Sequence, residues 1–237
     1  KEEEIDKQVE TLLRLGVIRP SQAAAYSQVV LIKKANGKFR MCIDYRALNT
    51  AMTNREWPLP LIAQMLRRIG QKRAKFYAIL DLLSGYHQMP LHEDSVKYTA
   101  FKTTKGLYEY TRVPFGLKVA GSYFQQNMVC SVVPNEIHNI CEVYMDDLLT
   151  WGATEEELLS NLETVYKRFR EANIVANPEK TRIGLIEVEY VGHTISPEGL
   201  GFTKEKIYKA LDFPKPTTLK TLQKFLGIVG YFRDHVR

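Results

Sequence analysis

The stretch Ile140-Cys141-Glu142-Val143-Tyr144-Met145-Asp146-Asp147-Leu148-Leu149 sets two adjacent carboxylates inside an apolar run. Successive side chains of an extended strand point to opposite faces, so Asp146 and Asp147 can share one site only where the chain bends beside them. Two carboxylates in apolar surroundings repel each other and are costly to desolvate unless a divalent cation neutralises them. The stretch therefore predicts a hairpin with the aspartates at its tip. The alternative for an Asp-Asp pair taken alone is an ordinary turn.

Asp81 is the candidate for a third carboxylate in the same site. The run Phe76 to Leu82 is apolar except at Asp81, which is typical of a strand buried on both faces with a carboxylate near its end. The alternative is a solvated turn aspartate. Oxygen ligands from few protein donors suit Mg²⁺, which keeps waters and recruits substrate phosphates. Two metal ions held by three aspartates are suited to in-line phosphoryl transfer, for example from a nucleoside triphosphate to a 3′-hydroxyl.

Apolar periodicity and turn residues predict the remaining elements. Helices are expected at Glu2 to Leu15, Leu61 to Ile69, Ala120 to Val132, Glu155 to Asn173 with Thr154 as N-cap, and Leu219 to Phe232. One hairpin is expected from Val29 to Lys33 and Phe39 to Tyr45, and a second from Tyr98 to Phe101 and Leu107 to Arg112 around Gly106.

Composition indicates a globular protein with a substantial core, since 45% of the 237 residues are hydrophobic and 25% are charged. We find no apolar run near the roughly 18 residues that span a bilayer, and the charged start differs from a secretory signal. A soluble, intracellular protein is therefore expected. The cysteines Cys42, Cys130 and Cys141 lack zinc-ligand spacing and are interpreted as reduced core residues. The net charge of +6 favours a polyanionic partner, although many basic proteins bind no nucleic acid.

Six further segments accompany the Tyr144-Met145-Asp146-Asp147 sequence. They are Arg40-Met41-Cys42-Ile43-Asp44-Tyr45-Arg46-Ala47-Leu48-Asn49, Leu80-Asp81-Leu82-Leu83-Ser84-Gly85-Tyr86-His87-Gln88, Pro114-Phe115-Gly116-Leu117, Asn177-Pro178-Glu179-Lys180, Tyr190-Val191-Gly192-His193-Thr194-Ile195-Ser196 and Phe225-Leu226-Gly227. Together they resemble, in type and order, the motifs of reverse transcriptases with their Tyr-x-Asp-Asp signature. Over essentially its whole length the chain is similar to the polymerase part encoded by long-terminal-repeat retrotransposons of the Ty3/gypsy group.

The resemblance implies an α+β fold, a right-hand polymerase with fingers, an antiparallel-sheet palm backed by helices, and a partial thumb. The fingers would comprise residues 1–75 and 90–113. The palm would comprise residues 76–89 and 114–200, with the Tyr-Met-Asp-Asp hairpin and a primer grip, and the thumb would begin in residues 201–237.

The same resemblance implies catalytic roles for Asp81, Asp146 and Asp147. Asp81 and Asp146 would ligate both of two Mg²⁺ ions with help from the Leu82 carbonyl, Asp147 would complete the acidic cluster, and Mn²⁺ is a possible substitute.

Nucleotide-binding residues are also implied: Lys33, Lys34, Arg40, Ser84, Gly85, Tyr86, Phe115 and Gly116. The lysines and Arg40 match positions that hold the triphosphate, although solvated hairpin residues are the alternative. Tyr86 matches an aromatic residue that excludes the 2′-hydroxyl, the alternative being a core tyrosine. Phe115 and Gly116 match a loop near the nucleotide and template.

Primer and template contacts are implied for a third set: Tyr144, Met145, Tyr190, Val191, Gly192, His193, Gln223, Gly227 and Tyr231. The segment from Tyr190 to His193 matches the primer-grip hairpin. The last three residues would lie on one helix face that follows the duplex minor groove, where glycine permits close approach. Core packing is an equally good interpretation of Tyr231.

Two local departures from the family pattern bear on loop geometry and template contacts. The stretch Lys118-Val119-Ala120-Gly121 lacks the usual asparagine and proline, and Leu83 replaces a commonly basic residue. The end at Arg237 leaves no room for a full thumb, a ribonuclease H domain, a protease or an integrase, so a piece of a polyprotein is expected.

The sequence thus predicts an RNA-directed DNA polymerase that extends a primer with dNTPs on an RNA or DNA template by two-metal-ion chemistry. Expected partners are template, primer, dNTP and the downstream thumb, ribonuclease H and integrase segments, with no membrane. The expected location is the cytoplasm, within virus-like particles. One alternative is a catalytically weak fragment that binds nucleic acid or a partner protein. An RNA-dependent RNA polymerase, the other alternative, shares the palm chemistry but normally tolerates a ribose hydroxyl, against which Tyr86 argues.

Overall fold

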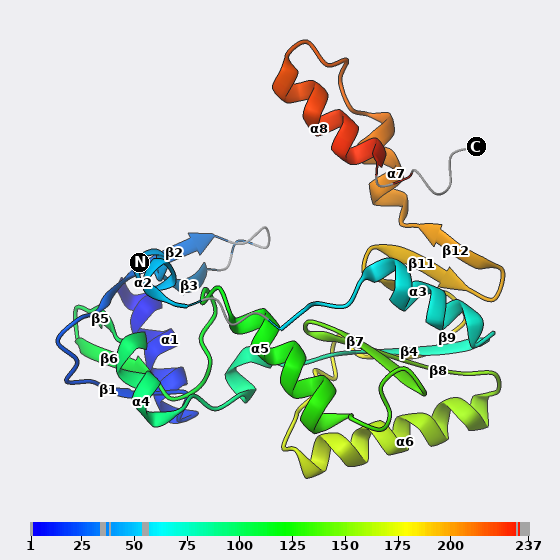
Figure 1. The fold of residues 1–237 in the computed structure, drawn as a ribbon. Helices are drawn as coiled ribbons and strands as arrows, with labels where there is room; N and C mark the ends of the chain where they lie inside the picture. The colour runs from blue at the N-terminus through cyan, green and yellow to red at the C-terminus, as the bar shows by residue number, and fades with distance from the viewer. Residues whose placement is uncertain (1, 34–36, 38, 54–56, 231, 233–237) are drawn as a thin grey trace.

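The computed structural model describes residues 2–33, 37, 39–53, 57–230 and 232. Its strands form a five-stranded, a four-stranded and a three-stranded sheet, which we call the N-terminal, central and third sheets. Figure 1 shows the N-terminal sheet in one lobe, the central and third sheets in a second lobe, and the last two helices projecting beyond β12.

The N-terminal sheet has the strand order β1-β6-β5-β2-β3. Its strands are β1 (Ile18–Pro20), β2 (Ser27–Lys33), β3 (Phe39–Ile43), β5 (Phe101–Thr103) and β6 (Gly106–Tyr110). Helix α1 (Glu2–Arg14) packs Val9 into a core shared with Ile18, Tyr45 and Phe101. Both predicted hairpins are present, and β2 also pairs in parallel with β5. Segments before and after strand β4 (Phe76–Asp81) therefore share this sheet.

The second hairpin begins later than predicted. A strand was expected from Tyr98, but Lys97–Thr99 forms a 3₁₀ turn (η2) after the short helix α4 (Glu93–Val96), and β5 starts at Phe101. The buried hydroxyl of Thr99 donates to the Val96 carbonyl at 2.7 Å and accepts from the Tyr110 N–H at 2.8 Å. These side-chain hydrogen bonds hold the backbone in the turn and so compete with strand pairing. Apolar patterning does not reveal such a competition.

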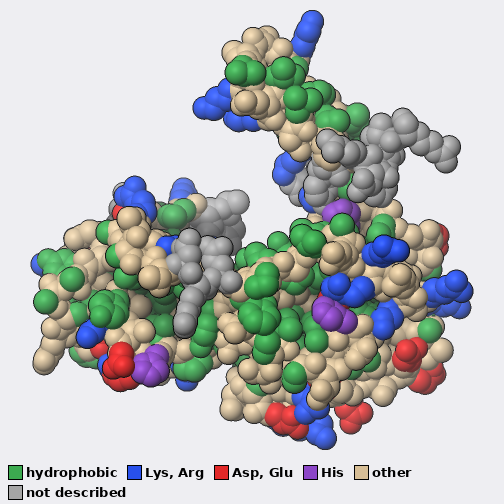
Figure 2. Space-filling view, in the orientation of Figure 1, with side chains coloured by type: hydrophobic (Ala, Val, Ile, Leu, Met, Phe, Trp, Pro, Cys, Tyr) green, Lys and Arg blue, Asp and Glu red, His purple; other side chains and the backbone are tan. Residues whose placement is uncertain are grey.

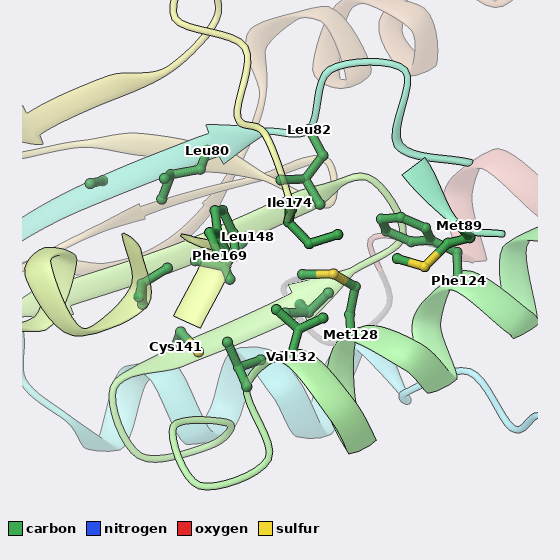
Figure 3. Packing of buried hydrophobic residues seen from close by; sticks show 14 of the residues in the cluster. Leu80, Leu82, Met89, Phe124, Met128, Val132, Cys141, Leu148, Phe169 and Ile174 are labelled. Carbon is green, nitrogen blue, oxygen red and sulfur yellow. The ribbon is translucent and has the colours of Figure 1, made fainter. Parts of the chain in front are cut away.

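The central sheet is entirely antiparallel, with the order β7-β8-β4-β9. Its strands are β4 (Phe76–Asp81), β7 (Cys141–Tyr144), β8 (Asp147–Gly152) and β9 (Arg182–Leu185). Helices α5 (Ala120–Asn127) and α6 (Glu155–Glu171) cover one face, where Leu80, Phe124, Leu148 and Phe169 pack together (Figure 3). Thr154 is the predicted N-cap of α6, accepting from the Glu157 N–H at 3.2 Å.

The opposite face of the central sheet packs on α3 (Ile62–Gln71) and on the third sheet, which has the order β10-β11-β12. The third sheet consists of β10 (Val188–Tyr190), β11 (His193–Ser196) and β12 (Gly199–Phe202). Along β4 the side chains alternate between the two cores, with Ala78 and Leu80 in one and Tyr77 in the other. This alternation confirms the prediction of a strand buried on both faces.

Three further observations concern the predicted helices and cysteines. The expected helix from Ala120 is regular to Asn127, and its last part, Met128–Val132, is π-helical (η3). Helices α2 (Arg46–Ala51) and α7 (Lys204–Leu211) and the 3₁₀ turn η1 (Gly85–Gln88) were not predicted. All three cysteines are free, but the assignment to the core is wrong for Cys130, which is exposed, and only Cys141 is fully buried.

Helix α8 (Leu219–Gly230) follows α7 and matches the predicted final helix. No residue of α8 is buried, although Leu219, Leu222 and Leu226 are large and apolar. Among the described residues, no helix has the length and apolarity needed to cross a membrane.

Candidate active site

The two adjacent aspartates lie at the tip of the hairpin formed by β7 and β8. Tyr144 pairs with Asp147, which leaves Met145 and Asp146 as the two-residue turn. Met145 has a φ of 53°, the left-handed conformation that such hairpin turns require and that side chains other than glycine rarely adopt. The turn supplies the bend that the sequence predicted.

Asp81 reaches this turn from the neighbouring strand. It is the last residue of β4 and pairs directly with Asp147, so the two side chains share one face of the sheet. The Leu82 N–H donates to the carbonyl of Asp146 at 3.0 Å, which ties the turn to the exit of β4. The strand register therefore brings Asp81, Asp146 and Asp147 together, as predicted.

Two carboxyl groups of the cluster, those of Asp146 and Asp147, have raised pKa values. Burial raises the pKa of Asp146, and the charge of Asp81 raises it further. Burial also raises the pKa of Asp147, with added contributions from Asp81 and then Asp146. Lys180 acts in the opposite direction on both carboxyl groups.

The residues fit a divalent cation bound through oxygen atoms. Among the described residues, no group of three or more His, Cys, Asp and Glu side chains is assembled as a ready metal cage. Yet the Oδ1 atom of Asp146 is buried and has no hydrogen-bond partner within the described part of the chain. A buried, unpaired carboxylate oxygen in a cluster with two other carboxylates is suited to a cation that brings its own water and phosphate ligands.

A turn after α6 brings a lysine onto the cluster. The Asn177 N–H donates to the carbonyl of Asp81 at 2.7 Å, and the Nζ atom of Lys180 lies 2.9 Å from Asp81 Oδ2. This Asn-Pro-Glu-Lys segment is one of the motifs shared with reverse transcriptases, and its sequence alone did not indicate the contact.

Gln125 of α5 supports the hairpin turn and was missed by the sequence analysis. Its side chain is fully buried, donates to the Val143 carbonyl at 2.8 Å and accepts from the Met145 N–H at 2.9 Å. Gly121, one turn earlier, leaves room for Met145, because a Cβ atom there would lie 2.8 Å from the Met145 Cε. The departure from the family pattern at Gly121 thus lies directly against the turn.

The residues predicted near the nucleotide sugar lie beside Asp146. A Cβ atom on Gly85 would lie 3.1 Å from Asp146 Oδ1, and Ser84 before it has a φ of 48°. The Tyr86 ring lies 5.1 Å from the Phe115 ring and 5.6 Å from the Phe124 ring, centroid to centroid. The pKa of Tyr86 is raised by burial and by Asp146.

Gly116 has a φ of 97° and accepts a hydrogen bond from Asn49 Nδ2 at 2.8 Å through its carbonyl. The loop that carries Phe115 and Gly116 is thereby tied to helix α2.

His87 completes the aromatic group and was not predicted as a site residue. Its ring lies 4.9 Å from the Phe115 ring and 5.7 Å from the Tyr110 ring, centroid to centroid. Its Nε2 atom is buried with no partner in the described part of the chain, and burial lowers the pKa of the imidazole to about 4. His87 is therefore neutral at physiological pH.

The predicted triphosphate-binding residues are far from the aspartates in the sequence and belong to a different sheet. Lys33 ends β2 and Arg40 lies on the neighbouring edge strand β3, and both side chains are exposed. Lys34 falls outside the described residues.

The segment predicted as the primer grip forms the β10–β11 hairpin. Tyr190 pairs with His193, and the turn residues Val191 and Gly192 have φ values of 45° and 77°. A β-branched residue with positive φ is strained, and such strain is often kept for a functional purpose.

Within this hairpin the side chain of Tyr190 points into the core, and the primer contact predicted for this residue stays a prediction. That side chain is 1% exposed, and its hydroxyl donates to the Glu142 carbonyl at 3.2 Å, so it anchors the hairpin to β7. His193 is also largely buried and stacks on Phe202 at 5.3 Å between centroids.

Gln223 and Gly227 lie four residues apart on α8, both exposed and on one helix face. Tyr231, predicted to share that face, falls outside the described residues.

The comparison with protein families agrees with this geometry. Residues 32–195 match the family described as reverse transcriptase (RNA-dependent DNA polymerase). The chain belongs to the reverse transcriptase family.

Similar reverse transcriptase sequences occur in retrotransposon polyproteins of the Ty3/gypsy type. The chain is 34% identical to the retrovirus-related Pol polyproteins from the Drosophila melanogaster transposons opus and gypsy, over 99% and 98% of its length. It is 32% identical to the transposon Tf2-7 polyprotein of Schizosaccharomyces pombe over 94% of its length. The chain spans only 24%, 23% and 17% of these relatives, respectively.

Solved reverse transcriptase structures share the fold. The foamy viral protease-reverse transcriptase in complex with double-stranded DNA superimposes with a TM-score of 0.83 at 28% identity, covering 97% of this chain and 47% of that one. The same protein in complex with an RNA/DNA hybrid gives a TM-score of 0.81 at 27% identity, covering 98% and 31%. The predicted α+β right-hand polymerase fold is confirmed.

Proposed function

We propose that this chain is an RNA-directed DNA polymerase that adds dNTPs to a primer 3′-end on an RNA or DNA template. The observation that carries the proposal is the register of the central sheet, which pairs Asp81 with Asp147 and sets Asp146 in the turn between β7 and β8. Three carboxylates on one edge, with one buried oxygen unpaired, form a site for divalent cations.

Asp81 and Asp146 would hold two Mg²⁺ ions, helped by the Leu82 carbonyl, and Asp147 would add negative charge behind them. When bound, the ions activate the primer hydroxyl and stabilise the leaving pyrophosphate, and Mn²⁺ has the same kind of chemistry. The protein's own part is to hold the carboxylates in register and to keep Asp146 in a partly buried, low-dielectric setting.

Residues around the aspartates would position the nucleotide. Tyr86, held between the rings of Phe115 and Phe124, is the proposed barrier to a ribose 2′-hydroxyl. Gly85, for which a Cβ would approach Asp146 Oδ1, allows the nucleotide backbone or sugar to come close. Ser84 and Gly116 both have positive φ and set the backbone direction of the segments that carry Tyr86 and Phe115.

Basic side chains around the site would hold the phosphates of nucleotide and nucleic acid. Figure 2 shows an open hollow bordered by the N-terminal lobe and the C-terminal helices, with Lys and Arg side chains on both borders. Lys33 and Arg40 are exposed on one side, and the segment from Lys204 to Gly230 carries six lysines against two acidic residues. Such borders attract a polyanion and supply phosphate contacts.

We propose that this hollow seats the primer and template. The Val191–Gly192 turn and the Gln223–Gly227 face of α8 would contact the duplex, as would the backbone of Tyr144 and Met145. The division into fingers at 1–75 and 90–113, palm at 76–89 and 114–200, and a thumb beginning at 201 is part of the same proposal. The polyprotein relatives support further partners among the other segments of such a polyprotein. A cytoplasmic location within virus-like particles is part of the same proposal.

Primer extension on an RNA template with Mg²⁺ and dNTPs tests the proposal. We expect extension by the wild-type chain and its loss in Asp146→Asn, while Asp94→Asn, whose side chain is 91% exposed on α4, retains activity. Equal extension by Asp146→Asn and the wild type would contradict the catalytic assignment.

The second candidate function is nucleic-acid or partner binding with weak catalysis, favoured by the lack of any buried residue in α8. Tight duplex binding without incorporation, restored by adding downstream sequence, would support this candidate instead.

A further inference from the structure

Lys180 is bonded to one carboxylate oxygen of Asp81, which is a proposed metal ligand. Its Nζ atom lies 2.9 Å from Asp81 Oδ2, and Asp81 is the paired neighbour of Asp147. A carboxylate oxygen that accepts a hydrogen bond from an ammonium group cannot hold a cation at the same position, because the two positive charges repel each other.

Backbone hydrogen bonds hold the segment that carries Lys180 next to Asp81. After α6 the chain runs beside the exit of β4, with the Leu83 N–H donating to the Val175 carbonyl at 3.1 Å and the Asn177 N–H donating to the Asp81 carbonyl at 2.7 Å. The Gln88 side chain adds bonds of 2.7 Å to the Leu83 carbonyl and 2.9 Å to the Val175 carbonyl. Three of these four hydrogen bonds join the two segments and fix one against the other.

A tight turn then points the lysine back at the aspartate. The Asn177 carbonyl accepts from the N–H groups of Lys180 at 3.3 Å and Thr181 at 2.9 Å, and its side chain accepts from the Glu179 N–H at 3.1 Å. Proline at the second turn position fixes φ and limits the alternatives. Lys180 therefore starts from a fixed backbone point next to the carboxylates.

The ion pair is also easy to break. The side chain of Lys180 is 64% exposed, so its ammonium group can turn into solvent and be hydrated there. The side chain of Asp81 is only 24% exposed and stays in the cluster. A divalent ion carries twice the charge and can contact Asp81 and Asp146 together.

We propose that Lys180 is a built-in cation that neutralises Asp81 in the metal-free protein and is displaced when metal binds. It holds the three carboxylates together before metal arrives, and it weakens metal binding by the free energy needed to break the Asp81 pair. The inference rests on the proposed metal site, and it adds a residue that sets the metal concentration at which that site fills.

Direct Mn²⁺ binding, measured by electron paramagnetic resonance without nucleotide or nucleic acid, tests the inference independently of catalysis. Removing the charge in Lys180→Met is expected to tighten Mn²⁺ binding about three- to tenfold. Lys180→Arg, which keeps the charge, should bind within about twofold of the wild type. Lys7→Met on α1 removes an equal charge from an exposed helix in the other lobe and should change nothing.

Unchanged or weaker Mn²⁺ binding by Lys180→Met overturns the inference, as does an equal gain in Lys7→Met, because a general charge effect would then explain both. Thermal unfolding of each variant verifies folding. Asp81→Asn separates the two proposals: if it binds Mn²⁺ as the wild type does, the metal site and the role of Lys180 both fail. If it loses binding while Lys180→Met equals the wild type, only the role of Lys180 fails.

Discussion

Gln125 and Met145 are joined by a hydrogen bond of 2.9 Å, in which the backbone N–H at the tip of the β7–β8 hairpin donates to the side-chain oxygen of the glutamine. The same side chain donates to the Val143 carbonyl at 2.8 Å, so one buried residue of α5 holds both β7 and the first residue of the turn that carries Asp146. The turn needs such support because Met145 has a positive φ.

Gln125→Met is therefore expected to lower the free energy of unfolding by about 1–3 kcal/mol, since the N–H of Met145 and the carbonyl of Val143 lose their partner. Primer extension should fall with it, because Asp146 follows the freed turn. Gln126→Met, at the exposed neighbouring position, is the matched control. Equal urea-denaturation curves for the two variants would show that the turn does not depend on Gln125.

Tyr86 should determine sugar selection through its ring rather than its hydroxyl. We expect Tyr86→Ala to raise the efficiency of rNTP relative to dNTP incorporation by on the order of 10–100-fold, because the barrier beside Asp146 is removed. Tyr86→Phe keeps the ring between Phe115 and Phe124 and should keep the preference. Steady-state incorporation of matched nucleotides measures the ratio, and an unchanged ratio in Tyr86→Ala would refute the assignment.

Gly152→Ala is expected to destabilise the central sheet. A Cβ atom at Gly152 would lie 2.8 Å from the Thr154 carbonyl oxygen and 2.9 Å from the Leu158 Cα, and these are backbone atoms that cannot turn aside. We expect a loss of about 2–3 kcal/mol in the free energy of unfolding. Gly70→Ala in α3, where nothing lies within 4 Å of the new Cβ, should instead stabilise by about 0.5–1 kcal/mol. Thermal unfolding compares the two, and losses of similar size would contradict the steric account.

His87 should make the protein sensitive to acid. Burial lowers its folded-state pKa to about 4 from 6.5, so the unfolded chain binds a proton that the folded chain does not as the pH falls from about 6.5 to 4. The free energy of unfolding is expected to fall by on the order of 2 kcal/mol across that range. His87→Phe keeps an aromatic ring against Phe115 and removes the titrating group, so it should flatten this part of the pH profile. Parallel profiles for wild type and variant would rule out His87 as the cause.

The sequence predicted the central strands well because their patterns were strong. The apolar run that Asp81 interrupts and the apolar run around Asp146 each admitted few structures, and the strand register then followed from the two-residue turn. The short strands β9 to β12 were harder, since each has only three or four residues and little periodicity. For the segment from Tyr190 to His193, the family motif marked the hairpin but not which side chains turn inward.

The polar residues that support the site were not predictable from pattern alone. Gln125 lies in a helix whose neighbours are mixed in polarity, and its role depends on a turn 20 residues later in the chain. The contact between Lys180 and Asp81 joins residues 99 positions apart. The first contact depends on how α5 packs on β7, and the second on the path of the chain between α6 and β9. No local spacing records either arrangement.

The parallel pairing of β2 with β5 has a consequence for the order in which the chain folds during synthesis. Strands from before and after β4 complete one sheet, so the first lobe cannot close until about residue 110 has left the ribosome. By then β4 has been synthesised, but its partner strands on both sides, β8 and β9, have not. Both of these strands begin more than 60 residues after the end of β4. We therefore expect the nascent chain to hold an exposed, unpaired apolar strand for several seconds at ordinary rates of synthesis, the interval in which it is most prone to aggregate.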